Sequence, residues 1–243
     1  MQKDFNDFTQ DKYKELLQIA KSLNNFIFYD EITLFDRFIL WRHDVDFSME
    51  YALKLARIEY NENVKSTFFL HSHNHFYNLL DDKSFAIVKE IISLGHQIGI
   101  HFDTHYYNIK NEEDIEVCLL KEKKLFMDIL EIEPRVFSFH NTDTFILSCK
   151  KSMYGGLINT YSQFFQDNVK YCSDSNGYWR HLPIKDLLKQ NYDKLQILTH
   201  PGWWQEKPDT PYNRICNIVN NKCKQILLDY EKTLEKFNRI NIK

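Results

Sequence analysis

The sequence predicts an α/β protein with parallel strands, and three observations support this prediction. Short apolar and β-branched runs suited to buried strands recur along the 243 residues, and helical patterns lie between several of them. A hydrophobic content of 43%, with 15% aromatic residues, is enough for a sizeable core. Only six glycines and five prolines occur, and no linker-like or repeated stretch divides the chain. We therefore expect a single domain over residues 1–243.

Seven segments are predicted as strands because they are short, apolar and rich in β-branched or aromatic residues. They are Phe38–Trp41, Thr67–Leu70, Gln97–Ile100, Val136–Phe139, Leu157–Thr160, Val169–Cys172 and Leu195–Leu198. Ser48 is the expected N-cap of a helix that follows the first strand, and apolar residues at three- and four-residue spacings predict helices over Ser84–Leu94 and Glu112–Leu130. One further helix at each end, over Asp11–Leu23 and Tyr212–Phe237, is expected to cover the outside.

Composition disfavours several classes of partner. The net charge of -3 leaves no excess of lysine and arginine for a phosphate backbone, so nucleic acid is not an expected partner. The polar N-terminus has no signal-like apolar region, and no later window approaches about 18 uninterrupted apolar residues, so we expect a soluble, cytoplasmic protein. The five cysteines form no C-x-x-C pair and are expected to be reduced thiols.

Charged and histidine residues gather where the predicted strands end. In parallel α/β folds the carboxyl ends of the strands meet at one edge, where ligands bind. The residues that follow the strands are Arg42, His43, Asp44, Asp46, His71, His73, His75, His101, His105, His140, Asp174 and His200. We expect them to converge on one rim.

Two of these groups indicate a metal site. Unpaired buried carboxylates are costly, so Asp44 and Asp46 are expected either to meet solvent at a cleft or to hold a positive group between them. The alternative is that they cap the helix near Ser48. His101 and His105 are four residues apart, a spacing that lets one helical turn or tight loop aim both rings at one point. Two imidazoles and one carboxylate are typical of a catalytic zinc site, although a His-x-x-x-His pair alone is a weak signal.

Three motifs resemble those of the NodB-type polysaccharide deacetylases, carbohydrate esterase family four. They are RHDVD at Arg42–Asp46, GHQIGIHFDTH at Gly95–His105 and LQILTHP at Leu195–Pro201, in the order in which that family has them. The first motif also resembles the WbmS-like branch, which is found with surface-polysaccharide genes. The resemblance implies a distorted (β/α) barrel of about seven parallel strands.

The resemblance also implies roles for individual residues. Asp46, His101 and His105 would bind Zn²⁺ or another divalent metal such as Ni²⁺, Co²⁺ or Fe²⁺, and Asp44 would be the base that deprotonates the attacking water. His200 would protonate the departing amine, and Asp174 would hold its other ring nitrogen. The implied reaction is removal of an N-acyl group, expected to be N-acetyl, from a sugar or glycan precursor in surface polysaccharide biosynthesis.

The chain departs from the family pattern at one position. The arginine that normally follows the fourth strand is absent, and PRVFSFHNT places His140 near it, where His140 would add a polar contact to the substrate. Arg42 and Arg180 are the two arginines that could reach the base instead. The departure motivates an alternative hypothesis of a catalytically degenerate, glycan-binding barrel.

Two other features leave alternatives open. HSHNH at His71–His75 is also how amidohydrolase barrels begin a metal site, so a metal amidohydrolase acting on a non-sugar amide is a further alternative. If that segment does not bind a metal or substrate, it is a polar loop. Trp203 and Trp204 follow His200 and are predicted to stack on sugar rings, with core packing as the alternative. Sugar, acyl group and oligomeric state are not predicted.

Overall fold

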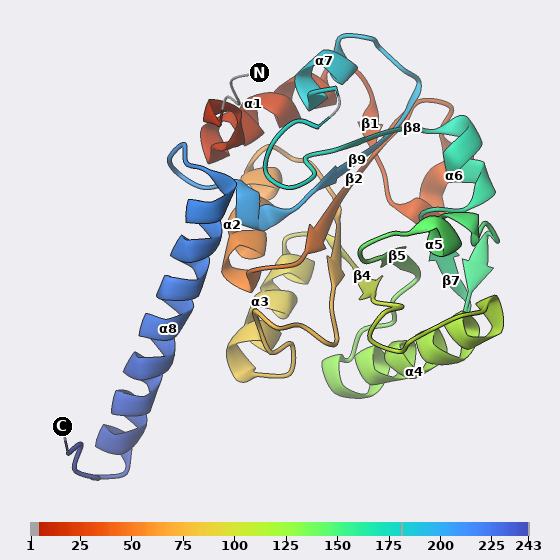
Figure 1. The fold of residues 1–243 in the computed structure, drawn as a ribbon. Helices are drawn as coiled ribbons and strands as arrows, with labels where there is room; N and C mark the ends of the chain where they lie inside the picture. The colour runs from red at the N-terminus through yellow and green to blue at the C-terminus, as the bar shows by residue number, and fades with distance from the viewer. Residues whose placement is uncertain (1–4, 181, 243) are drawn as a thin grey trace.

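The computed structural model describes residues 5–180 and 182–242 and is built around one curled β-sheet (Figure 1). The strands follow one another in the order β6-β7-β5-β4-β3-β2-β9-β8, and β1 pairs with the start of β2. All pairings are parallel except that between β6 and β7. The strands are β1 (Asn25–Phe26), β2 (Phe38–Val45), β3 (Thr67–Leu70), β4 (Gln97–Phe102), β5 (Val136–Phe139), β6 (Met153–Tyr154), β7 (Leu157–Asn159), β8 (Lys170–Ser173) and β9 (Lys194–Thr199).

Helices connect the strands and lie outside the curl of the sheet (Figure 1). The α-helices are α1 (Gln10–Lys21), α2 (Met49–Asn61), α3 (Asp82–Ser93), α4 (Glu112–Leu130), α5 (Thr144–Ser148), α6 (Gln163–Asn168), α7 (Ile184–Leu188) and α8 (Pro211–Lys236). Short 3-10 helices are η1 (Asn6–Phe8), η2 (Tyr29–Leu34) and η3 (Pro201–Trp203). The predicted α/β class with a mostly parallel, barrel-like sheet is confirmed. The sheet is an open half-barrel, because β6 and β8 stand at the two ends of its strand order.

All seven predicted strands and all five predicted helices are present among the described residues. Ser48 caps α2 as expected, with its hydroxyl accepting a hydrogen bond from the Tyr51 amide at 3.2 Å. The two-residue strands β1 and β6 were not predicted because so short a run carries no periodicity. β2 is longer than predicted and runs to Val45, so Arg42, His43 and Asp44 lie within the strand and not after it.

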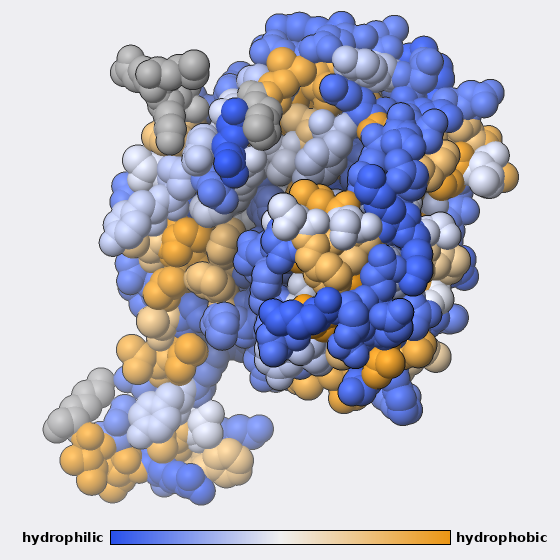
Figure 2. Space-filling view, turned by 45° about the vertical axis from the view of Figure 1, so that its right-hand side comes forward, coloured by the Kyte–Doolittle hydropathy of each residue, from blue (hydrophilic) through white to orange (hydrophobic). Residues whose placement is uncertain are grey.

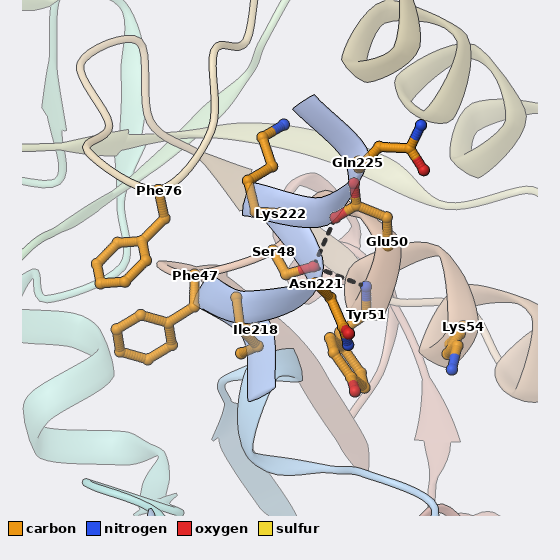
Figure 3. Close-up of a pocket in the computed structure, with 10 residues that line it drawn as sticks. All are labelled: Phe47, Ser48, Glu50, Tyr51, Lys54, Phe76, Ile218, Asn221, Lys222 and Gln225. Atoms are coloured by element: carbon orange, nitrogen blue, oxygen red, sulfur yellow. Dashed lines mark hydrogen bonds between the residues drawn. The ribbon is translucent and has the colours of Figure 1, made fainter. Parts of the chain in front are cut away.

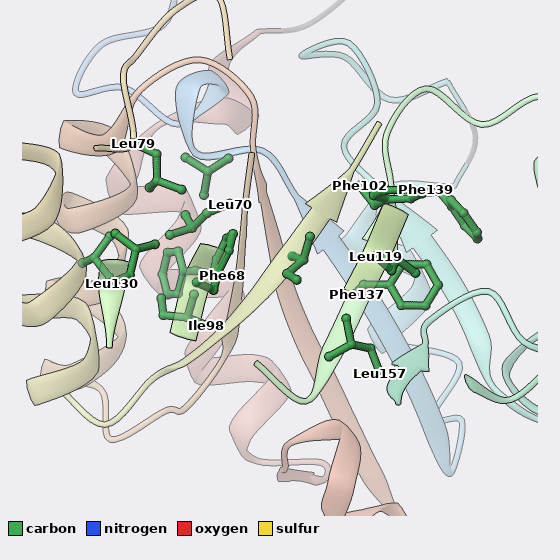
Figure 4. Packing of buried hydrophobic residues seen from close by; sticks show 14 of the residues in the cluster. Phe68, Leu70, Leu79, Ile98, Phe102, Leu119, Leu130, Phe137, Phe139 and Leu157 are labelled. Carbon is green, nitrogen blue, oxygen red and sulfur yellow. The ribbon is translucent and has the colours of Figure 1, made fainter. Parts of the chain in front are cut away.

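The outer face of the sheet forms the largest hydrophobic core (Figure 4). Phe68 and Leu70 of β3 and Ile98 of β4 are fully or almost fully buried there. Helices α2, α3 and α4 supply the opposing side chains, among them Leu130 at the end of α4. This face is mostly apolar, with His43 of β2 as a buried polar exception, and the alternate residues of the strands project from the other face.

The inner face changes character along β2. Alternate residues share a face, so Phe38 and Leu40 point inward into an apolar cluster, and Arg42 and Asp44 point inward beyond them. Gly99 of β4 is required on this inner face, because a Cβ atom there would lie 2.6 Å from the Phe69 ring. The interior is therefore apolar at the amino ends of the strands and charged at their carboxyl ends.

The two terminal helices differ in how much of their surface is buried. α1 buries four of its residues against the sheet, among them Tyr13 and Leu17. The described residues of α8 include only two buried side chains, Arg214 and Ile218, and the end of the helix beyond its Asp229–Lys83 contact projects from the body (Figures 1 and 2). The expectation that α8 covers the outside is therefore correct only for the part of the helix before that contact. No described helix is both long and apolar enough to span a lipid bilayer.

Candidate active site

Asp44 is held by a buried arginine at the carboxyl end of β2. The Arg42 guanidinium is completely buried and donates to Asp44 Oδ2 at 2.7 Å. It also donates to the Thr160 hydroxyl at 2.9 Å, and Ser138 Oγ donates to Asp44 Oδ1 at 3.1 Å. Burial by itself would raise the pKa of Asp44, but Arg42 and then His101 outweigh it, so this pKa is lowered and the carboxylate is ionised.

Asp46 lies two residues further on, among three imidazole rings. Its Oδ1 atom is 3.2 Å from His101 Nε2, 3.4 Å from His71 Nε2 and 3.5 Å from His140 Nδ1. That oxygen is buried, and no hydrogen-bond partner meets it with good geometry within the described part of the chain. The histidines follow β3, lie in β4 and follow β5, so three neighbouring strands deliver them to the same point.

The four side chains fit a metal ion. Asp46, His71, His101 and His140 each present one ligand atom, and these atoms all lie within 4.8 Å of one another. Three nitrogens and one carboxylate oxygen suit zinc and neighbouring transition metals. His101 is further oriented by Ser138 Oγ, 2.7 Å from its Nδ1 atom, which leaves Nε2 directed at Asp46.

His105 does not join this group, although its spacing from His101 predicted that it would. The chain leaves β4 at Phe102 and enters a turn over residues 104–108, so the four-residue spacing does not correspond to a helical turn. His105 is exposed, and its Nε2 atom lies 3.1 Å from the backbone oxygen of Asn141. In its place the structure brings His71 and His140 to Asp46.

His200 and Asp174 form a hydrogen-bonded pair beside Asp46. His200 Nδ1 is 2.5 Å from Asp174 Oδ1, and its Nε2 atom lies 3.7 Å from Asp46 Oδ2. Asp174 Oδ2 also accepts the His200 backbone amide at 2.8 Å and the Trp204 indole at 3.0 Å. Burial opposes protonation of His200, but the Asp174 carboxylate outweighs it and raises the pKa of His200 to about 9.

The predicted substrate-stacking residues are placed differently. Trp203 and Trp204 are buried, Trp204 completely, so neither presents an open ring face to a ligand. Trp204 packs against Phe8 and Tyr13 in the core and contributes its indole N–H to Asp174. Arg180 is exposed, and Arg42 is the arginine that contacts Asp44.

His43, the middle residue of the Arg-His-Asp run, faces away from these groups. It lies on the outer face of β2, where its Nε2 atom is 2.7 Å from Glu59 Oε1 and its Nδ1 atom is 2.8 Å from the Thr199 hydroxyl. Strand alternation explains the separation, because Arg42 and Asp44 share the inner face and His43 must take the other. The Arg-His-Asp run therefore contributes Arg42 and Asp44 to the inner face and His43 to the buried Glu59 network on the outer face.

A cleft of about 730 Å³ opens beside the Asp46 group. Asp46, His71 and His140 form part of its wall. A stacked pair, His73 and Tyr106, lines another part, with ring centroids 3.7 Å apart and planes 10° from parallel. The cleft can therefore receive a molecule of sugar size with its polar atoms toward Asp46.

A second, smaller hollow of about 240 Å³ lies between α2 and α8 (Figure 3). Ser48 and Tyr51 line one side of it, and Ile218 and Lys222 of α8 line another. Asp46, His71, His101 and His140 do not line this hollow, but Phe47 and Phe76 line both it and the cleft beside Asp46. The two hollows are therefore neighbours separated by these aromatic side chains.

Two residues of the site were not singled out from the sequence, and a third was predicted with a different role. Ser138 and Thr160 act on Asp44 and Arg42, and Trp204, predicted to stack on sugar rings, donates to Asp174. These hydrogen bonds join residues far apart in the chain. His71 carried a usable signal, because it follows a strand that neighbours both β2 and β4. The sequence favours a polar loop for His71–His75, with a metal or substrate role as the alternative. The position of His71 beside Asp46 agrees with the alternative.

Comparisons with known proteins give no match to any protein-family model or curated protein. Solved structures that resemble this chain include a Streptococcus mutans CE4 esterase, with 16% identity, coverage of 88% of this chain and 87% of that one, and a TM-score of 0.49. A family 4 carbohydrate esterase from Bacillus anthracis is 17% identical, with coverage of 88% of this chain and 86% of that one and a TM-score of 0.45. A family 4 acetyl xylan esterase from Clostridium thermocellum, solved with a cobalt ion, is 16% identical, with coverage of 77% of this chain and 83% of that one and a TM-score of 0.41. Because the identities and TM-scores are this low, the ligands and substrates of these proteins are not transferred to this chain.

Proposed function

We propose that this chain is a metal-dependent hydrolase of the NodB type that removes an N-acyl group from a sugar or glycan precursor. The observation that carries the proposal is the buried Asp46 oxygen among three imidazoles, with Asp44 on one side and the His200–Asp174 pair on the other. Such an arrangement places a metal-ligand set, a base and an acid around one point. The motif resemblance in the sequence supports the same reaction.

Asp46, His71, His101 and His140 are the proposed ligands. A divalent metal bound there, zinc or alternatively nickel, cobalt or iron, supplies a Lewis acid that polarises a carbonyl oxygen and makes water more acidic. His105, the ligand implied by the motif, is exposed within the turn that follows β4, and its ring lies against the Asn141 backbone oxygen. The proposal therefore replaces His105 by His71 and His140.

Asp44 is the proposed base, and Arg42 is its positioning residue. Arg42 keeps the carboxylate ionised and fixes its orientation, while Ser138 restrains the second oxygen. An ionised, fixed carboxylate beside the ligand set can accept a proton from the water that attacks the amide carbonyl. The contact of Arg42 with Asp44 favours a hydrolase over the glycan-binding alternative, because an arginine contacts the proposed base although none follows β5.

His200 is the proposed acid. Its Nδ1–H bond to Asp174 favours the protonated ring and leaves Nε2 directed toward Asp46. From there the ring can donate a proton to the amine that departs when the C–N bond breaks. Trp204 and the His200 backbone amide hold Asp174 in place, so the acid is oriented before substrate binds.

The finer part of the proposal concerns the cellular setting. We place the reaction on an intermediate of surface glycan assembly in the cytoplasm. The five cysteines are all unpaired thiols, which is the state expected in a reducing compartment. The cleft beside Asp46 can hold one or two sugar units, and the stacked His73 and Tyr106 rings offer a flat face for them.

The first experiment is elemental analysis of the purified protein together with hydrolysis of N-acetylated sugars. We expect about one divalent metal ion per chain and release of acetate that stops with a chelator and returns with zinc. The double variant H71A/H101A should lose both the metal and the activity, whereas H105A, a matched histidine control, should retain the metal. Activity without metal, or metal loss in H105A alone, would contradict the proposal.

A further inference from the structure

α8 carries an exposed apolar seam with the period of a coiled coil. Tyr212, Cys216, Val219, Cys223, Ile226, Tyr230, Thr233 and Phe237 follow one another at alternating spacings of four and three residues. An alternation of this kind repeats every seven residues and keeps its members in one stripe along the helix. The stripe extends over the whole of α8.

The seam is separate from the side of α8 that contacts the body. The body-facing residues Arg214 and Ile218 lie about a third of a turn around the helix from the seam, at 3.6 residues per turn. Ile226, Tyr230 and Phe237 are more than half exposed, at 56%, 55% and 58%. Figure 2 shows apolar side chains gathered on this projecting part of the molecule.

We propose that this seam pairs with the same seam of a second copy of the chain, in antiparallel orientation. In that orientation large side chains face smaller ones in the middle of the seam, because Tyr230 meets Val219 of the second copy and Ile226 meets Cys223, and the aromatic rings of Tyr212 and Phe237 meet at its two ends. The arrangement is self-complementary, as a twofold interface requires. A parallel pair would instead set each residue against itself, so that Tyr230 faces Tyr230.

Charge supports the same orientation. Lys222 and Asp229 flank the seam on the same side, one heptad apart. Antiparallel pairing brings Lys222 of each copy beside Asp229 of the other, so two attractive pairs form across the interface. Parallel pairing would place Lys222 against Leu227 and Asp229 against Leu234, with no charge complement. Within one chain Asp229 pairs with Lys83 of α3 and accepts a hydrogen bond from Gln225, and Lys222 lines the hollow between α2 and α8, so both residues lie between the seam and the body.

Light scattering coupled to size exclusion tests the pairing with the full chain. The wild type is expected at twice the chain mass of 29.4 kDa, and I226D, with a charge in the seam, is expected at 29.4 kDa. L228D is the matched control, because Leu228 is exposed on the same helix but on the face opposite the seam. A monomeric wild type, or an I226D variant that dimerises as well as L228D does, would overturn the proposal. A monomeric wild type that sediments with anionic lipid vesicles would reassign the seam to a membrane surface.

Oxidative cross-linking tests the orientation. In a C118S/C223S background, Cys216 is the remaining seam thiol, and antiparallel pairing separates the two copies of it by most of the helix length. We expect no cross-linked dimer until Thr233, which faces Cys216 of the second copy, is replaced by cysteine. A dimer linked through Cys216 alone would overturn the antiparallel arrangement.

Discussion

Asp44 shows how a few neighbouring atoms set the chemistry of one residue. It sits at the charged end of an otherwise apolar strand interior, with Arg42 on one oxygen and Ser138 on the other. Both partners are buried, so their geometry is fixed by packing and not by solvent. This makes the carboxylate a stationary proton acceptor whose role can be separated from metal binding.

The variant D44N tests that separation. The amide has nearly the shape of the carboxylate but cannot take up a proton, so we expect turnover to fall by about 10²- to 10⁴-fold. Metal content should stay at the wild-type level because Asp44 is outside the proposed ligand set. Steady-state rates and elemental analysis of the same preparation measure both effects. Full turnover in this variant would assign the base to another group.

At the scale of elements, a buried network on the outer face ties α1, α2 and β2 together. Glu59 of α2 accepts from the Tyr13 hydroxyl of α1, lies 2.7 Å from His43 Nε2 and accepts from Ser66 Oγ at 2.6 Å. Burial by itself would raise the pKa of Glu59, but His43 and then His96 outweigh it and bring it below its ordinary value of 4.5. The network therefore requires an ionised glutamate in the interior.

This network predicts how stability depends on pH. Because the folded-state pKa of Glu59 is lowered, its contribution is complete above pH 4.5 and is lost as pH falls through the folded-state value. E59Q should lower the free energy of unfolding at neutral pH by about 3–5 kcal/mol, and its deficit relative to wild type should shrink in acid. Urea unfolding between about pH 7 and pH 3 measures this.

The control for that experiment is E62Q, three residues further along the chain, at the end of α2. The Glu62 carboxylate is paired with Lys14 and accepts a hydrogen bond from Gln18 at the surface, and its substitution should change stability little. A deficit in E59Q that stays constant across the whole pH range would show that Glu59 acts through shape alone and not through its charge.

At the scale of the whole molecule, the proposed ligands join four neighbouring strands at one edge of an open sheet. Asp46, His71, His101 and His140 belong to β2, β3, β4 and β5 or directly follow them. A metal bound only by the folded chain stabilises it by mass action, by about 4 kcal/mol when the free metal exceeds its dissociation constant a thousandfold. Metal binding at this edge and folding of the chain are therefore thermodynamically linked.

We expect a chelator to lower the melting temperature of the wild type by about 2–4 °C for each kcal/mol of lost metal binding. H71A/H101A should melt at the same temperature with and without chelator, and H105A should respond as the wild type does. Differential scanning calorimetry measures all three. A wild-type melting temperature that does not respond to chelator or added zinc would argue against a resident metal.

The sequence by itself determined the fold class and the location of the site. Strand length, apolar runs and Ser48 as a cap are local properties, so the seven strands and five long helices could be predicted from neighbouring residues. The edge at which Asp44, Asp46, His101, Asp174 and His200 meet could also be predicted, because parallel strands bring their carboxyl ends together.

Only the tertiary structure decided which side chains meet there. Whether His71, His105 or His140 reaches Asp46 depends on the course of the turns after β3, β4 and β5, and turn geometry is set by packing between distant segments. Likewise Trp204 is assigned to Asp174 by the pairing of β8 with β9, whereas Arg42 and Asp44 share a face because they are two residues apart on one strand. Contacts such as that between Trp204 and Asp174 join residues far apart in the chain, and no local pattern records them.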